Sequence, residues 1–275
     1  MLNTALARGR ANHLALAARS VHRFRYAAIS VVSAGAFIGL WEYLAWIHAI
    51  DPEFFPPPSH VWGELIKLLS DGTLLIYIAE SARRVLLGFV LSSAVGIPLG
   101  ILLGTFLPFR WIVQPLISII RPLPSLAWIP LSLLWLGIGE SQKYAIVFMG
   151  TLAPLVVFVT DATLRIEPIY IRAAQNLGAS RWRIMWEVVL PGALPSIVSA
   201  LKVTLALAWT CIISAEMVGS KDGLGYLIWN AKDWSNVGQV MVGMLAISAT
   251  VLTLDSVVRL VEHRLIPWHR HQEQR

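Results

Sequence analysis

Six long apolar stretches limit what this 275-residue chain can fold into. A run of about 20 apolar residues can cross the hydrocarbon core of a bilayer as a helix. Charged residues make up only 14% of the sequence, against about a quarter in soluble domains. The sequence therefore predicts an all-α polytopic membrane protein with six transmembrane helices, at 27–50, 85–109, 111–139, 144–160, 195–216 and 237–254.

The basic residues predict how the spans are oriented, because Lys and Arg gather in cytoplasmic loops. One side of the predicted membrane carries 14 of them: Arg8, Arg10, Arg19, Arg23, Arg25, Arg110, Arg165, Arg172, Arg181, Arg183, Arg259, Arg264, Arg270 and Arg275. The other side carries 4: Lys67, Lys143, Lys221 and Lys232. Both termini and the loop at 161–192 are therefore expected in the cytoplasm.

The segment 171–197, "IRAAQNLGASRWRIMWEVVLPGALPSI", interrupts the apolar pattern with polar residues. Small side chains on one face of 171–178 would let another backbone approach closely. Gly178 is suited to end this helix in a left-handed conformation, and Ser180 can cap a second helix, which we expect Pro191 to stop. The residues thus predict two short helices at a corner, either a docking surface or an ordinary amphipathic loop.

The same segment resembles the "EAA" signature of ABC importer permeases, which reads Glu-Ala-Ala, three residues, Gly, nine residues, Ile, one residue, Leu-Pro. Here Ala173-Ala174, Gly178 and Leu190-Pro191 stand at the matching places, with Arg172 in the Glu place and Val188 in the Ile place. The stretches 121–141, 215–228 and 264–269 are similar to the branch serving taurine, alkanesulfonates, nitrate and bicarbonate. We expect taurine or alkanesulfonates, with nitrate or bicarbonate as the alternative.

The resemblance implies a type I ABC importer permease fold in a bacterial inner membrane. It also implies two cytoplasmic ATPase subunits, an extracytoplasmic binding protein and a second copy of the chain. No cofactor is expected in this chain, since ATP and Mg would be held by the ATPase. The loop at 168–192 would couple the ATPase to the spans through Arg172, Ala173, Ala174, Gln175, Asn176, Leu177, Gly178, Ala179, Leu190 and Pro191.

Four residues within the spans are candidates for the substrate pathway: Arg121, Pro124, Trp128 and Glu216. Arg121 lies between apolar runs beside two prolines, where the helix must break. Its guanidinium could bind an anionic head group or form an ion pair with a buried carboxylate such as Glu216. Glu80 and Arg84 have the spacing of an ordinary helix-surface pair. Glu42, in the first span, could pair with a neighbouring helix.

The sequence lacks the motifs that are typical of several other function classes. There is no G-x-x-x-x-G-K-[ST] loop for nucleotide phosphates, no H-E-x-x-H motif and no metal-ligand cluster. His263, His269 and His271 indicate a solvated basic tail. A rival class, an ATPase-independent secondary transporter or channel, should show inverted repeats and paired midplane carboxylates, and neither is found. No catalytic residue and no nucleic-acid partner is expected.

The predicted organisation has five parts. A basic cytoplasmic N-terminus (1–26) precedes the first transmembrane helix (27–50) and an extracytoplasmic segment (51–78). This segment contains a helix at 58–70 that is too short and too charged to span the membrane, so we expect it at the interface. The permease core covers 79–262, and a basic cytoplasmic tail covers 263–275.

Overall fold

A computed structural model of the protein describes residues 28–265, with side chains up to residue 260. The predicted basic N-terminus, residues 266–275 and the side chain of His263 lie outside what is described. Every regular element in the described part is helical. The chain divides into two compact units, Met1–Glu64 and Leu65–Arg275, with the boundary inside α2 (Pro58–Ser70).

The first unit contains the membrane-spanning helix Ala28–Trp46 and the start of α2. Glu42 accepts hydrogen bonds from the Ser59 backbone N–H at 3.0 Å and from the Ser59 hydroxyl at 2.7 Å. A carboxylate is favourable at a helix N-terminus, where backbone N–H groups are unpaired. Glu42 therefore pairs with the start of α2, which is the helix predicted at 58–70.

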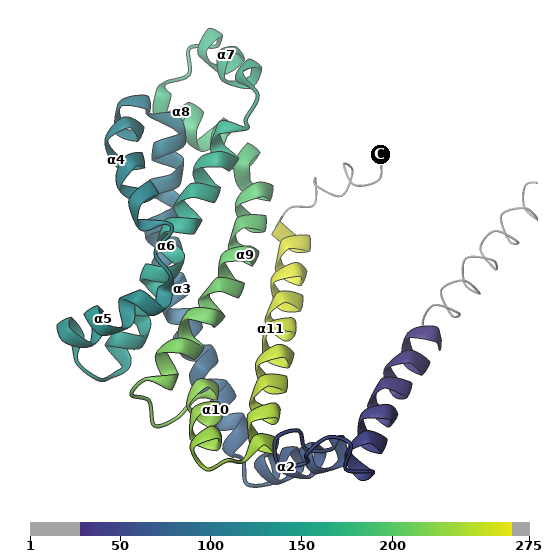
Figure 1. Ribbon diagram of the computed structural model, residues 1–275. Helices are drawn as coiled ribbons and strands as arrows, with labels where there is room; N and C mark the ends of the chain where they lie inside the picture. Colours follow the sequence, from purple (N-terminus) through teal and green to yellow (C-terminus); the bar gives the residue numbers. More distant parts are fainter. Residues whose placement is uncertain (1–27, 266–275) are drawn as a thin grey trace, which may run out of the picture. The chain divides into compact units, whose positions relative to one another are not determined.

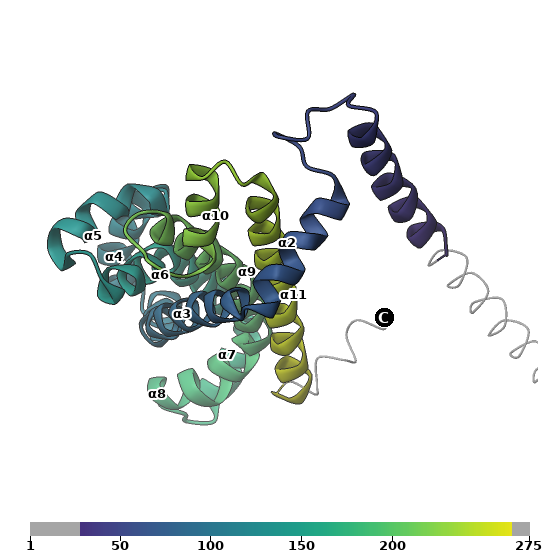
Figure 2. The same ribbon diagram turned by 90° about the horizontal axis from the view of Figure 1, so that it is seen from below.

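The second unit is a group of long helices with short helices at both ends (Figure 1). After α2 the chain forms α3 (Thr73–Thr105), α4 (Leu107–Ile120), α5 (Trp128–Leu136), α6 (Glu140–Leu164), α7 (Pro168–Asn176), α8 (Arg181–Ile184), α9 (Leu190–Met217), α10 (Leu224–Asp233) and α11 (Val237–Leu265). Helices α3, α6 and α9 pack together around Ile101, Leu155, Val159, Ala193 and Ile197. Figure 2 shows α4 and α5 on one side of this group and α11 on the other.

Small residues at every fourth position of α3 form its contact with α6. They are Gly88, Ser92, Gly96, Gly100 and Gly104. A Cβ atom added at Gly100 would lie 2.6 Å from the Cβ of Val159, closer than real Cβ atoms approach. The two helices are therefore packed at a separation that only small side chains allow, as in other membrane helix pairs.

The span predicted at 111–139 is broken in the middle. Helix α4 ends at Ile120, and the segment Ser125–Leu136 leaves at an angle of 86°. Pro122 and Pro124 lie in the break, which confirms the predicted interruption at Arg121. Five helices in the described residues are long and apolar enough to span a membrane, or six if this bent pair counts as one.

Candidate functional site

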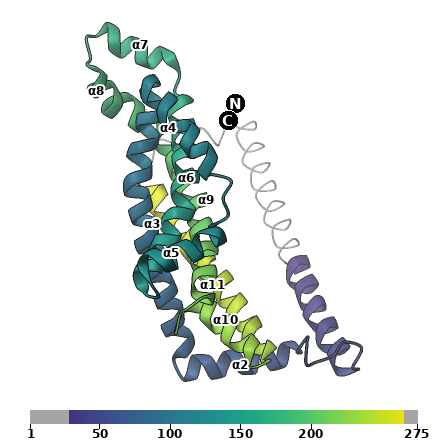
Figure 3. The same ribbon diagram turned by 60° about the vertical axis from the view of Figure 1, so that its left-hand side comes forward.

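The α7 end of the second unit is the first candidate site, and it carries the predicted corner (Figure 3). Gly178 has φ of 77°, in the left-handed region, and its N–H bonds to the Gln175 carbonyl at 2.9 Å. The Ser180 hydroxyl accepts the Arg183 backbone N–H at 3.3 Å and caps α8. The helix, its glycine end and the serine cap are therefore confirmed.

Helix α7 presents an apolar face that the described chain leaves uncovered. Its large apolar members are Ile169, Tyr170 and Leu177, which is 88% exposed. Ala173 lies between them on the same face by helical spacing. A Cβ added at Gly178 meets no atom within 4 Å. This face is available to another molecule.

The other predicted coupling residues divide between two places. Arg172, Gln175 and Asn176 are exposed on α7, whereas Ala174 and Ala179 are half-buried. Leu190 packs against the apolar core from the first turn of α9, and Pro191 beside it is exposed. Residues 172–179 therefore lie on more than one face of the corner, and Leu190-Pro191 begins the long membrane helix that follows it.

The prediction that Pro191 stops the second helix is wrong. Helix α8 continues through a π-helical turn, Met185–Val189, directly into α9. Proline lacks a backbone N–H and is tolerated in the first turn of a helix. The preceding π turn places Pro191 in such a first turn, so the backbone stays helical over Arg181–Met217.

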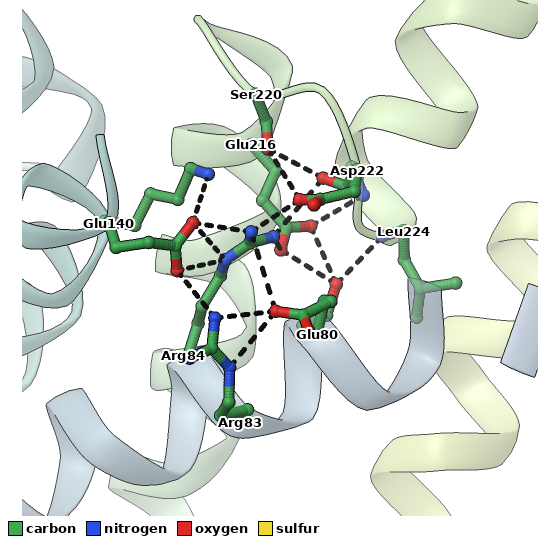
Figure 4. Close-up of polar contacts among 11 residues, drawn as sticks. Glu80, Arg83, Arg84, Glu140, Glu216, Ser220, Asp222 and Leu224 are labelled. Carbon is green, nitrogen blue, oxygen red and sulfur yellow. Dashed lines mark hydrogen bonds and ion pairs between the residues drawn. The ribbon is translucent and has the colours of Figure 1, made fainter. Parts of the chain in front are cut away.

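The opposite end, where α10 lies, holds a buried charge network centred on Arg84 (Figure 4). The Arg84 side chain is 1% exposed. Its Nη1 donates to Glu216 Oε1 at 2.9 Å, its Nη2 to Glu140 Oε1 at 2.6 Å, and Nη2 also to the Asp222 carboxylate. One guanidinium thus joins α3, α6, α9 and the turn before α10.

Glu216 is saturated by its neighbours in this network. It accepts the Ser81 hydroxyl at 2.8 Å and the Gly225 N–H at 2.9 Å. The Ser81 oxygen in turn accepts the Leu224 N–H at 2.8 Å. Gly225 also packs tightly, since an added Cβ would lie 2.5 Å from the Ile213 carbonyl. Buried polar groups are stable when every member has a partner, so this network clamps the helices together.

One prediction about these residues is wrong, the alternative of an ion pair between Arg121 and Glu216, and the predicted pair of Glu80 with Arg84 is present but is not the main contact of Arg84. Glu216 forms its ion pair with Arg84, and no ion pair between Glu216 and Arg121 occurs in the described chain. Arg84 is more than a surface partner of Glu80, from which its Nη2 lies 3.8 Å away. Because Glu216 is buried and fully bonded, it presents no free oxygen to a substrate. Its side-chain partners Ser81 and Arg84 lie 135 and 132 positions away in the sequence, so spacing could not reveal them.

A groove between α4 and α6 contains Arg121, the remaining charged pathway candidate. The groove has a volume of about 260 Å³, and its polar lining residues are Gln114, Ser118, Arg121, Thr160 and Asp161. Pro124 and Trp128 lie beyond Arg121, at the bend and at the start of α5. Asp161 was missed in the sequence, although an acidic residue within one turn of an apolar run was a usable signal.

A family model described as the binding-protein-dependent transport system inner membrane component matches residues 96–271. The chain belongs to this family of ABC importer permeases. The taurine transport system permease protein TauC of Escherichia coli (strain K12) is 33% identical over 250 residues, which cover 89% of this chain and 91% of TauC. The putative aliphatic sulfonates transport permease protein SsuC of Bacillus subtilis (strain 168) is 28% identical over 86% of each chain.

Solved structures agree with the fold of this permease. An inward facing conformation of the MetNI methionine ABC transporter matches with a TM-score of 0.60 and 21% identity, over 71% of this chain and 95% of that chain. The predicted type I permease fold is therefore confirmed. This permease is a multi-pass membrane component of a binding-protein-dependent importer. Because the chain belongs to this family, the alternative of an ATPase-independent transporter or channel is excluded.

Proposed function

We propose that this permease belongs to an importer for taurine or a related alkanesulfonate. The observation that carries this proposal is the similarity to TauC over 89% of the chain, and the similarity to SsuC points to the same sulfonate chemistry. A nitrate or bicarbonate importer of the same branch is the alternative. The binding protein would select the cargo, and the permease would move it across the membrane.

The proposed orientation has both termini and the α7 end in the cytoplasm. Its support is the uneven distribution of Lys and Arg, 14 on one side against 4 on the other, since positive residues favour the cytoplasmic side. The α10 end with the Arg84 network would then face the binding protein. The membrane would be the bacterial inner membrane.

Helix α7 is the proposed docking element for the ATPase. Its exposed apolar face, with Leu177 88% exposed, would be unfavourable in water and is typical of an interaction surface. Residues 172–179 would contact the ATPase, and Leu190-Pro191 would transmit its movement to α9 through the continuous helix Arg181–Met217. The chain itself would need no cofactor, because ATP and Mg would bind the ATPases.

We also propose a homodimer with two ATPases beneath it. Helix α4 has no buried residue, and Gln114, Ser118 and Arg121 on it are exposed. Polar side chains of this kind are unfavourable against lipid, so a second copy of the chain or an aqueous pathway between two copies would cover them. ATP-driven closure of the ATPases would open that pathway outward, and hydrolysis would return it inward.

The test is ATP hydrolysis by the complete transporter in nanodiscs, with its ATPase and binding protein. We expect stimulation by taurine or an alkanesulfonate and none by nitrate or bicarbonate. Ala173→Trp should abolish this stimulation and reduce ATPase co-purification at least about tenfold, because a bulky side chain would prevent close docking. Ala173 is a better site than Gly178, since its backbone has no left-handed strain.

The matched control is Asp233→Trp, which places the same side chain on an exposed residue at the α10 end. It should co-purify with the ATPase as the wild type does. If Ala173→Trp retains both association and stimulation, α7 is not the docking surface. If nitrate or bicarbonate alone stimulates, the cargo assignment is wrong and the alternative of the same branch replaces it.

A further inference from the structure

The groove between α4 and α6 holds two opposite charges that do not pair with each other. Arg121 lies at the end of α4, and Asp161 lies three residues before the end of α6. Both are exposed, and both line the groove. Among the described residues, neither the guanidinium nor the carboxylate has an ion pair or a side-chain hydrogen bond.

The neighbouring cation, Arg165, forms no ion pair with Asp161 either in the described chain. Arg165, one helical turn further on, lines an adjoining hollow together with Asp161, Ser196 and Ser199. No ion pair joins Arg165 to Asp161 in the described chain, although the spacing allows one. Asp161 therefore lines both hollows.

Unpaired charges within membrane helices are unfavourable unless they face a water-filled cavity, and they often mark the route of a substrate. Two other polar side chains of the groove are uncharged and already have hydrogen-bond partners. The hydroxyls of Ser118 and Thr160 donate to carbonyls of their own helices, Gln114 and Val156. Their oxygens remain able to accept a hydrogen bond from a ligand.

A ligand with both signs of charge fits this arrangement better than a simple anion. A sulfonate can accept two parallel hydrogen bonds from a guanidinium, as other oxyanions do. A primary ammonium can donate to a carboxylate and to hydroxyl or amide oxygens. Nitrate, bicarbonate or an alkanesulfonate would leave Asp161 unpaired and would be repelled by it.

We infer that the groove is a binding site for a zwitterionic amino-sulfonate, with the sulfonate on Arg121 and the ammonium on Asp161. This inference rests on the proposed function and narrows its cargo to the class that contains taurine. It also assigns the permease a selectivity of its own, in addition to that of the binding protein. The competing explanation is a carboxylate that is merely solvated near the end of α6.

The test is equilibrium binding of radiolabelled ligands to the permease–ATPase complex in nanodiscs, without the binding protein. Taurine is compared with propane-1-sulfonate, in which a methyl group replaces the ammonium. The wild type should bind taurine at least about tenfold more tightly. Asp161→Asn should remove this preference by weakening taurine alone, and Arg121→Gln should weaken both ligands at least about tenfold.

Asp255→Asn is the matched control, because Asp255 is an acidic residue on α11 that lines neither hollow and pairs with Arg259. It should bind both ligands as the wild type does. Co-purification of the ATPase with each variant shows that the variant is folded. A taurine preference that survives in Asp161→Asn, or a wild type that binds neither ligand, would overturn the inference.

The proposed function is judged separately, by stimulation of the wild-type complex with loaded binding protein. If a sulfonate-loaded binding protein stimulates ATP hydrolysis while Asp161→Asn binds taurine normally, only the binding site in the groove is refuted. If no sulfonate-loaded binding protein stimulates the complex, the proposed cargo fails as well.

Discussion

The α10 end and the α7 end of this permease use their polar residues in opposite ways. At the α10 end, the buried guanidinium of Arg84 bonds to Glu140, Glu216 and Asp222, which come from distant parts of the sequence. At the α7 end, the polar contacts that shape the corner are local, such as the Ser180 cap on Arg183. One end is held by tertiary ion pairs and the other by the chain's own turns.

This difference matches what each end would have to do. The buried pair of Arg84 and Glu216 holds helices in fixed relative positions, because removing Arg84 leaves the buried Glu216 carboxylate without its cation. An exposed helix such as α7 gains little from the rest of the chain, which leaves its apolar face uncovered. The α3–α6 contact, from Gly88 to Gly104 on α3, runs between the two ends.

The largest expected effect comes from removing Arg84, the centre of the charge network at the α10 end. Arg84→Met should lower the free energy of unfolding by about 3–5 kcal/mol, because it leaves the Glu216 carboxylate buried without its cation. The measurement is thermal unfolding of the purified permease in nanodiscs. Arg83→Met is the control; its side chain is 49% exposed, so the loss there should stay below about 1 kcal/mol.

Adding Glu216→Gln to Arg84→Met should recover part of the loss, since the buried negative charge is then removed as well. Equal destabilisation by Arg84→Met and Arg83→Met would show that the burial of Arg84 contributes nothing to stability. The contrast between tertiary ion pairs at the α10 end and local contacts at the α7 end would then fail.

A smaller effect is expected from the contact between α3 and α6. Gly100→Leu should cost about 1–3 kcal/mol, because the new side chain would overlap Val159 and approach the Val156 carbonyl. Gly39→Leu is the matched control in the helix Ala28–Trp46, where an added Cβ meets nothing within 4 Å. Thermal unfolding distinguishes the two, and an unchanged midpoint for Gly100→Leu would contradict the close packing.

The smallest effect should be at the α7 end and should remain local. Ser180→Ala removes the cap of α8 and should destabilise that turn by about 1 kcal/mol. Amide hydrogen exchange at 181–184 should then accelerate severalfold, without a change in the unfolding midpoint. Ser180→Asn, which can still cap, should exchange as the wild type does. A lowered unfolding midpoint would mean that the α7 end contributes to global stability as the Arg84 network does.

The sequence by itself determined the spans, the short helix at α7, its end at Gly178 and the cap at Ser180. These features depend on an apolar run or on hydrogen bonds between residues only a few positions apart, so their causes lie within the local sequence. The break at Arg121 belongs with them, because adjacent prolines interrupt a helix wherever it packs.

Only the tertiary structure decided which charges meet. Arg84 and Glu216 are 132 positions apart, and nothing local distinguishes their pairing from the expected pair with Glu80. Asp161 shares a groove with Arg121 because α4 packs beside α6, and Pro191 stays within a helix because a π turn precedes it. Burial and opposing partners belong to the packed molecule, since a residue's neighbours in space depend on how separate helices pack together.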